Sequence, residues 1–347
     1  MGGKRNGSVV RAAAVLMTLL LTCAVPAAAV AQQGTDTLRV AYPPGFVIGV
    51  LDFLKALTPH LAEYGIKLDL IPFRGGADSA IAVAAGRADF NLGSVSPVVS
   101  VALQGSPLKI INAYAFEDAN HRTGTVVVVR NEIKNWNDLR GKTLGTHRLG
   151  SLSDVTARLL LAKHGLTVGK DITIIELPFD GMAPALQRNQ VQALAFFPPY
   201  AAEIYNQGYG SELGRTSEVI PQLVRESWTV NTFFLRRNRA LTLRLMKAIL
   251  LATYDLSRMP DARYISFIGS LWDGPQAILP DLSKYKMLHD LFVFDPAALR
   301  GAVETQVRVM QDFGIVKRVP AGFVDKLVDD SVMTQAYQEL HAQKRLP

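Results

Sequence analysis

The sequence predicts an α/β protein with two similar lobes, each a mostly parallel sheet flanked by helices, with a ligand cleft between the lobes. Three observations lead to this prediction. Apolar strand patterns alternate with short helical patterns along most of the chain, as in parallel sheets covered by helices. One strand–helix–strand pattern occurs twice. Pro and Gly mark the ends of elements and do not gather into a linker, so we expect strands to join the lobes as hinges.

The internal repeat relates residues 66–97 to residues 171–200. In each copy an apolar strand ends in Pro-Phe-x-Gly, a short helical pattern follows, and a second apolar strand runs into a turn with proline. Ligands of α/β sheets bind beyond the carboxyl ends of the strands, so the repeat predicts that both lobes aim equivalent edges at one crevice. The aligned pairs are Arg74 with Asp180, Ser94 with Phe197, and Pro97 with Tyr200.

The first lobe is expected to begin with a strand over 37–42, which a Pro-Pro-Gly turn ends. A helical pattern follows over 46–64 and ends at Gly65, a residue suited to the left-handed conformation after a helix. The remaining elements are strands over 66–73, 88–92 and 108–114 and helices over 77–85 and 96–104.

The second lobe repeats this plan, and two β-rich segments flank it as the expected crossings between lobes. Its elements are strands over 142–147, 172–178 and 191–197 and helices over 151–164 and 182–188; further helices are expected over 242–254, 296–313 and 320–327. We therefore expect lobe one to be discontinuous, with residues 32–122 plus 237–347. Lobe two is expected to span 123–236, with hinge strands near 123–130 and 229–236.

Residues 1–31 are predicted to be a cleavable signal peptide. A basic start is followed by an uncharged apolar run over 12–25, and Ala-Val-Ala at 29–31 fits a cleavage site. The run is shorter than the roughly 20 apolar residues that span a membrane. Cys23 is not preceded by the small residue typical of lipidated cysteines, so we expect no lipid anchor there. The mature protein is expected to be periplasmic.

The composition excludes several classes of function. Removal of residues 1–31 lowers the formal net charge from +7 to +4 and takes away the only cysteine. The remaining charge is too small and too scattered for a nucleic-acid surface, and the mature chain has neither disulfides nor a cysteine metal site. No H-E-x-x-H, G-x-S-x-G or phosphate-binding glycine motif occurs. We therefore expect no enzyme, no metal and no cofactor.

Several stretches, in this order and spacing, resemble the nitrate/sulfonate/taurine group of periplasmic solute-binding proteins and the related thiamine-pyrimidine-binding proteins. They are AVAAGRADF at 82–90, GSVSP at 93–97, WNDLRGKTLG at 136–145, Gly150-Ser151 and Pro199-Tyr200-Ala201. The resemblance covers roughly residues 36–260. It implies a type II periplasmic-binding-protein fold, a monomer, and a partner ABC permease with its ATPase, which would be the mature protein's contact with the membrane.

The chain departs from this family's pattern in two places. Residues 189–193 read NQVQA where G-x-x-D-A is usual, and Pro198 stands where an acidic residue is usual. Both places lie at the expected cleft edge of the second lobe. The ligand is therefore expected to differ from the common ones.

Serines form two pairs at the expected cleft edges. Ser94 and Ser96 lie at the start of a helix of lobe one, and Ser151 and Ser153 at the start of a helix of lobe two. Serine at such positions caps helices, and helix N-termini also bind anions. The sequence leaves both roles open, and we take all four serines as candidate ligand contacts.

Two arginines follow predicted strands and could each clamp an oxyanion with two hydrogen bonds. These are Arg74 and Arg148. A place on the rim, or in an ion pair between lobes, would explain them as well. Asp180 could hold a ligand amine or pair with Arg74 when the lobes close. Gly75 completes this set of candidates.

Aromatic side chains are expected near the crevice or hinge at Phe46, Phe116, Phe197, Tyr200 and Trp228. Aromatic residues at strand ends often belong to the core. Phe197 and Tyr200, however, frame a Pro-Pro turn and could stack on an organic ligand. A bare inorganic anion needs no such surface, so an organic anion is favoured over nitrate.

The sequence thus predicts an exported receptor that closes around a small, sulfonate-like organic anion and delivers it to an ABC importer. A thiamine pyrimidine or an aromatic carboxylate is an alternative ligand, and service to a sensor or another transporter is an alternative role. An enzyme on the same fold, like the yeast-type thiamine-pyrimidine synthases, is disfavoured. Those synthases carry a Cys-rich motif, and the mature chain has no cysteine.

Overall fold

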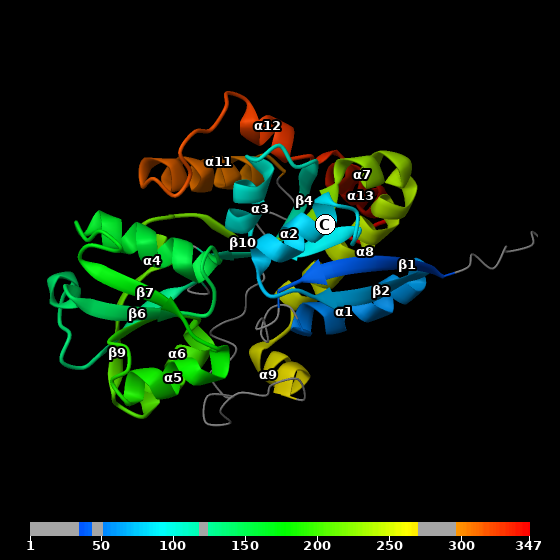
Figure 1. Ribbon diagram of the computed structural model, residues 1–347. Helices are drawn as coiled ribbons and strands as arrows, with labels where there is room; N and C mark the ends of the chain where they lie inside the picture. The colour runs from blue at the N-terminus through cyan, green and yellow to red at the C-terminus, as the bar shows by residue number, and fades with distance from the viewer. Residues whose placement is uncertain (1–34, 44–50, 118–123, 270–295) are drawn as a thin grey trace, which may run out of the picture. The chain divides into compact units, whose positions relative to one another are not determined.

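Figure 1 shows the computed structural model of the chain. It describes residues 35–43, 51–117, 124–269 and 296–347. Residues from Thr35 to Pro347 form one compact unit. The predicted signal peptide and Phe46 lie outside the described residues.

The first sheet has five strands in the order β2-β1-β3-β10-β4. Strand β1 runs parallel to β2 and β3, whereas β10 runs antiparallel to β3 and β4. With the helices packed on it, this sheet is called lobe one below. Its strands are β1 (Asp36–Tyr42), β2 (Ile66–Pro72), β3 (Phe90–Gly93), β4 (Leu108–Glu117) and β10 (Leu223–Asn231).

The second sheet has the order β7-β6-β8-β5-β9. Strand β6 runs parallel to β7 and β8, and β5 runs antiparallel to β8 and β9. This is the pattern of the first sheet, so the predicted class of two similar α/β lobes is confirmed. The strands of this lobe two are β5 (Val126–Arg130), β6 (Lys142–Thr146), β7 (Ile172–Glu176), β8 (Ala193–Phe196) and β9 (Gly210–Arg215).

Helices follow the parallel strands in both lobes. Lobe one carries α1 (Leu51–Glu63), α2 (Gly76–Ala84), α3 (Val95–Ala102), α7 (Thr232–Arg237), α8 (Arg239–Ser257), α9 (Asp261–Gly269), α12 (Phe323–Leu327) and α13 (Ser331–Ala342). Lobe two carries α4 (Leu152–Lys163), α5 (Phe179–Gln187), α6 (Pro198–Asn206) and the short 3₁₀ helices η1 (Trp136–Leu139) and η2 (Thr216–Glu218). Helix α11 (Pro296–Asp312) contacts α3 and β10 as well as α4.

The chain passes between the sheets twice, from β4 to β5 and from β9 to β10. Strands β4 and β10 lie side by side, with Glu117 opposite Leu223, so both crossings leave lobe one at one place. The predicted strand over 229–236 differs from the structure, because β10 ends at Asn231 and α7 follows. The Asn231 side chain accepts a hydrogen bond from the Phe233 N–H and so starts that helix. The predicted domain boundaries and the hinge action stay predictions.

The core of lobe one is centred on Trp228 of β10, which is fully buried. Its ring packs edge-on against Phe53 of α1 and Phe90 of β3. In lobe two, Phe179, Phe196 and Tyr200 form a second aromatic group. These rigid cores hold the carboxyl ends of the parallel strands, where the candidate site lies.

Candidate ligand-binding cleft

A small cavity of about 10 Å³, roughly the space that one water molecule needs, lies where the carboxyl ends of the two sheets meet. Lobe one lines it with Gly76, Ser94 and Pro97 at the starts of α2 and α3, and lobe two with His147, Ser151 and Phe197. Of the predicted site residues, Ser94, Ser151 and Phe197 are therefore brought together at one cavity. Pro43 and Leu152 complete the wall.

The two cavity serines do different things. Ser151 caps α4, since its hydroxyl accepts a hydrogen bond from the Asp154 N–H at 3.3 Å. Ser94 occupies the same cap position on α3, but its hydroxyl makes no capping bond. It lies instead 3.4 Å from Oε1 of Glu226, to which it donates. Ser94 is thus tied to a side chain far away in the sequence.

The other two predicted serines are fully buried. The Ser96 hydroxyl accepts a hydrogen bond of 2.6 Å from the Gln306 side chain of α11, which ties it to the protein interior. Ser153 lies in the first turn of α4, and its hydroxyl has no hydrogen-bond partner within the described chain. Ser153 is not among the residues that line the cavity, and its contact with a ligand stays a prediction.

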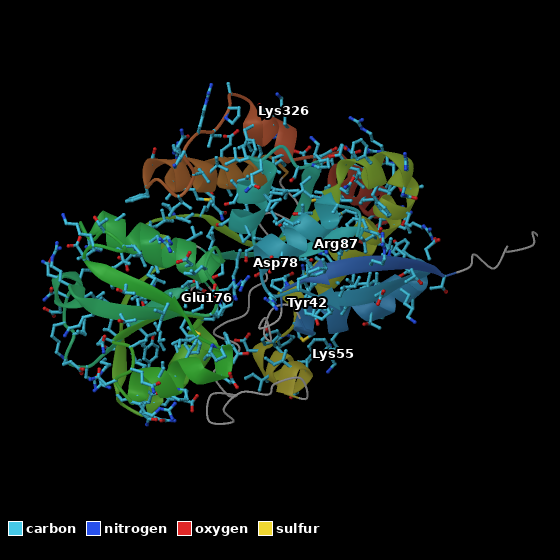
Figure 2. All side chains as sticks on the ribbon, in the orientation of Figure 1. Tyr42, Lys55, Asp78, Arg87, Glu176 and Lys326 are labelled. Atoms are coloured by element: carbon cyan, nitrogen blue, oxygen red, sulfur yellow. The ribbon has the colours of Figure 1, made fainter. Side chains whose placement is uncertain are left out.

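Arg148 lies between two carboxylates from different lobes. Its guanidinium is 3.5 Å from Asp78 of α2 and 3.4 Å from Glu176 of β7; both acids are labelled in Figure 2. The Arg148 stem comes within 3.1 Å of the position that a Cβ on Gly75 would take. Gly75 therefore admits this close approach, and Arg148 forms the ion pair between lobes that the sequence left open. Its contact with a ligand stays a prediction.

Arg74 and Asp180 are both exposed. Arg74 follows β2 and lines an open hollow with Arg87 and Arg148. Asp180 lies in the first turn of α5. Within the described residues no ion pair joins these two side chains, and their predicted contact with a ligand remains untested.

Aromatic rings form the lobe-two wall of the cavity. Phe197 is buried at the start of α6, with its ring centroid 6.3 Å from Phe179 and 5.9 Å from His147. Tyr200 packs edge-on against Phe179 at 4.4 Å, so it supports this wall. Phe116 lies in β4 opposite Val224; its side chain is outside the described part of the structure.

His147 lines the cavity; from its place in the sequence it could reach the cleft, but it was not chosen as a candidate ligand contact. It follows β6, and burial among the rings lowers its pKa to about 4. At neutral pH the imidazole is therefore uncharged and offers one N–H donor and one acceptor. Its place directly after a lobe-two strand was the signal that could have identified it.

Glu226 is the second residue that the sequence reasoning missed. It lies in β10, is fully buried, and burial raises its pKa to about 8, against the opposing effects of Arg225 and Ser94. Arg225 is itself buried, 3.8 Å from Oε1, with its guanidinium 4.8 Å above the Phe197 ring. The signal was an Arg-Glu-Ser run inside an otherwise apolar stretch.

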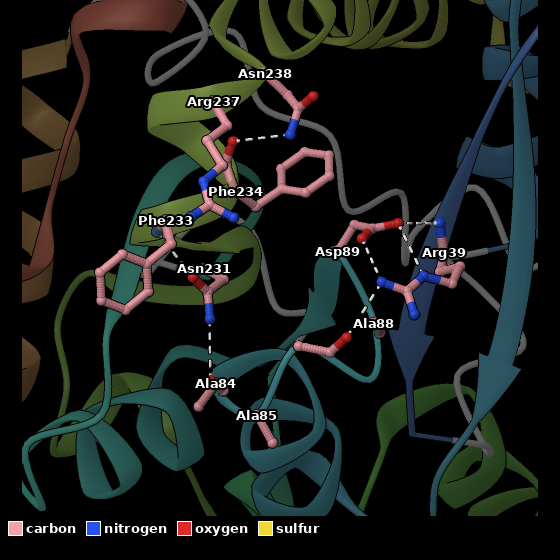
Figure 3. A pocket seen from close by; sticks show the side chains of 11 residues that line it. Arg39, Ala84, Ala85, Ala88, Asp89, Asn231, Phe233, Phe234, Arg237 and Asn238 are labelled. Carbon is pink, nitrogen blue, oxygen red and sulfur yellow. Dashed lines mark hydrogen bonds and ion pairs between the residues drawn. The ribbon is translucent and has the colours of Figure 1, made fainter.

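A second hollow lies on lobe one beside α7, and Figure 3 shows it. Arg39 pairs there with Asp89 at 2.7 Å, and the Asn231 amide donates to the carbonyl oxygens of Val83 and Ala84. These polar groups already satisfy one another.

Comparison with known proteins places the chain in a family. The sequence pattern of the NMT1-like family matches residues 18–268. The chain belongs to this family. A protein of Bacillus subtilis (strain 168) with the name "Putative binding protein YtlA" is 22% identical over 306 residues, which cover 86% of this chain and 88% of that protein.

Solved structures of solute-binding proteins share this NMT1-like chain's fold. The alkanesulfonate-binding protein SsuA from Xanthomonas axonopodis pv. citri, bound to MOPS, has a TM-score of 0.65 at 16% identity, over 87% of this chain and 98% of SsuA. The nitrate-binding protein NrtA from Synechocystis PCC 6803 has a TM-score of 0.70 at 14% identity, over 91% of each chain. The resemblance inferred from the sequence is confirmed at the level of family and fold.

Two further observations on the described residues bear on other kinds of function. No group of three His, Cys, Asp or Glu side chains within the described ranges is placed to hold a metal ion. None of the helices described by the structure combines the length and the apolar character needed to span a bilayer.

Proposed function

We propose that this protein is an exported receptor that captures a small organic anion, of the sulfonate class, and delivers it to an ABC importer. The observation that carries the proposal is the cavity at which α3 and α4, from different lobes, both begin. Helix N-termini present unpaired N–H groups and a positive dipole end, and so favour anions. The Ser94 hydroxyl makes no capping bond and links the cavity wall to the buried Glu226 carboxyl group.

The cavity wall carries little formal charge at neutral pH. His147 on the wall and Glu226 behind it are both uncharged there, and Arg148, which does not line the cavity, is paired with two carboxylates. An anion in this cavity would therefore be held by hydrogen bonds and helix dipoles, without a free arginine. Such sites select shape and hydrogen-bond geometry over charge alone.

The apolar wall supports an organic anion over an inorganic one. Phe197, Leu152 and Pro97 line the same cavity as the serines. A ligand with an anionic head and a hydrocarbon or aromatic body would bury that body against these side chains, at about 25 cal/mol per Å² of apolar surface. We choose the sulfonate class because the alkanesulfonate-binding protein SsuA has this fold.

In this proposal a ligand in the cavity bridges the lobes, because it touches α3 on one side and α4 on the other. It therefore binds the closed arrangement better than an open one, and closure follows from that difference in affinity. The Arg148–Asp78 ion pair adds a contact that exists only when the lobes meet. The closed form is what a permease would recognise.

A thermal-shift screen of residues 32–347, stripped of bound ligand by unfolding and refolding, tests the proposal. The panel holds alkyl and aryl sulfonates, taurine, nitrate, aromatic carboxylates and thiamine pyrimidines. A ligand at 100 times its Kd adds about 2.7 kcal/mol of stability, which raises the Tm by a few degrees. We expect the organic sulfonates to give the largest shifts and to be recovered chemically intact.

The variant Phe233→Ala is the matched control, because Phe233 is an exposed ring at the hollow beside α7. It should keep every shift, whereas Phe197→Ala should lose the shift with aryl sulfonates. A panel in which no anion shifts the Tm, or in which a ligand is consumed, would contradict the proposal.

A further inference from the structure

The hydrogen-bonding capacity of the Glu226 carboxyl group is only partly used by its neighbours. It lies near the start of β10, where the pairing with β4 changes register on both sides of it. Its carboxyl group is fully buried. Oε1 accepts one long hydrogen bond, of 3.4 Å, from the Ser94 hydroxyl, and Oε2 has no partner within the described chain.

This carboxyl group lies directly behind the cavity wall. Ser94 lines the cavity, so a single hydrogen bond separates Glu226 from it. Two residues further along β10, the indole N–H of Trp228 is also buried and has no partner among the described residues. Burying polar atoms without partners is unfavourable. Because Glu226 lies one hydrogen bond behind the cavity wall, its unpaired Oε2 indicates a ligand that pairs with it.

The charges around Glu226 are few. Arg225 is the charged group that acts on it, with Nε 3.8 Å from Oε1, beyond hydrogen-bond distance. The Arg225 guanidinium lies over the Phe197 ring. His147, on the opposite wall of the cavity, is uncharged above pH 4 or so because burial depresses its pKa to about 4. Arg225 and the hydrogen bond from Ser94 therefore oppose a neutral carboxyl group, and burial outweighs both.

We propose that Glu226 is a ligand-binding residue that remains a neutral carboxylic acid and donates its O–H, through Oε2, to an oxygen of the ligand's anionic group. This inference rests on the proposed function and deepens it. The ligand class is an oxyanion, such as a sulfonate, one of whose oxygens accepts the hydrogen bond from Glu226. The unprotonated Oε1 keeps its bond from Ser94.

The protonation of Glu226 fits this role. Burial raises its pKa to about 8, so the acid form predominates at neutral pH. A bound anion would stabilise the acid form further, because an ionised carboxylate would repel it. Affinity for a sulfonate should therefore be constant below pH 8 and fall by about tenfold per pH unit well above it.

Calorimetric titration with butanesulfonate and benzenesulfonate between pH 6.5 and pH 9.5 tests this inference. Neither sulfonate titrates in that range. Wild type should show the loss of affinity at high pH. Glu226→Gln should bind within about threefold of wild type at pH 7, because its amide N–H also donates, and should lose the pH dependence. Glu226→Met, which cannot donate, should bind at least tenfold more weakly at every pH.

Asp89→Asn is the matched control, since Asp89 is a buried carboxylate paired with Arg39 at the hollow beside α7. It should keep the wild-type pH profile. The inference is overturned if sulfonate affinity rises with pH, if Glu226→Gln binds as weakly as Glu226→Met, or if Glu226→Gln keeps the pH profile. Failure of wild type to bind any sulfonate would instead overturn the proposed function, and this inference with it.

Discussion

The two lobes share a sheet order but differ in what they offer at the cavity. Ser94 and Phe197 hold equivalent places. Each is at the N-cap position of the helix that follows the third parallel strand of its sheet, and neither makes a side-chain capping bond. Lobe one has a hydroxyl there, backed by a buried acid. Lobe two has an aromatic ring, backed by further rings. The repeated scaffold thus places two chemistries opposite each other, one for an anionic head and one for an apolar body.

The two lobes also differ in how burial acts on their titratable groups. In lobe one burial raises the pKa of Glu226 to about 8, and in lobe two it lowers the pKa of His147 to about 4. One is an acid and the other a base, so the same desolvation leaves both uncharged at neutral pH. Burial thus leaves an uncharged titratable group in each lobe beside the cavity, His147 on its wall and Glu226 behind it.

The largest expected effect follows from removing the aromatic wall. Phe197→Ala takes away a buried ring that packs against Phe179 and His147. We expect a loss of about 3 kcal/mol in the free energy of unfolding, measured by denaturant titration. Affinity for benzenesulfonate should fall at least tenfold and that for methanesulfonate less than threefold. Equal losses for both ligands would show that the ring holds no ligand body.

The second prediction concerns the pH dependence of stability. Between pH 4.5 and pH 8 folded Glu226 keeps a proton that the unfolded chain releases, so its contribution declines by about 1.4 kcal/mol per pH unit as pH rises. Between pH 4 and pH 6.5 folded His147 lacks a proton that the unfolded chain binds, so its contribution declines by a similar slope as pH falls. The two slopes oppose each other where they overlap.

Glu226→Gln should therefore remove most of the decline in unfolding free energy above pH 6.5. In His147→Gln the decline due to Glu226 should also be visible below pH 6.5, because the opposing effect of His147 is gone. Denaturant titrations of wild type and both variants at several pH values measure this. Parallel stability curves for all three proteins would show that neither group is perturbed.

The third prediction separates the two serines. Ser151→Ala removes a helix cap and should lower stability by about 1 kcal/mol. Ser94→Ala removes no capping bond, so its effect on stability should be smaller, while its effect on sulfonate affinity should be larger. Chemical denaturation and calorimetric binding on the same samples check both. A larger loss of stability in Ser94→Ala than in Ser151→Ala would contradict the assignment of Ser151 as the helix cap.

The smallest effect is expected at the ion pair between lobes. The Arg148 side chain is 34% exposed and its two acidic partners are 39–41% exposed, so each pair is worth at most about 1 kcal/mol. Arg148→Ala should weaken sulfonate binding by about three- to tenfold, and less at high salt. Asp78→Asn should reproduce part of that loss. Complete loss of binding in Arg148→Ala would instead show direct contact with the anion.

The repeat and the parallel strands could be predicted from sequence because their signals are local. The Pro-Phe-x-Gly motifs do mark the ends of β2 and β7, although Gly75 precedes α2 whereas Gly181 lies inside α5. Strand β10 was predicted to begin six residues late. Its first residues include Arg225, Glu226 and Ser227, which are polar and yet buried.

The site was less predictable because its contacts are not local. The sequence indicates a cap at Ser94 but cannot show that its hydroxyl donates to Glu226, 132 residues away. Nor can it show that Ser96 is held by Gln306 of α11, or that Arg148 lies between Asp78 and Glu176. These pairings depend on how the two sheets meet.

A crystal structure of the mature protein with benzenesulfonate would test the central claim most directly. The account predicts the sulfonate group between the N-termini of α3 and α4, with one oxygen within hydrogen-bond distance of Oε2 of Glu226 and the ring against Phe197. A sulfonate bound outside this cavity, or a cavity that excludes it at saturating concentration, would contradict the account.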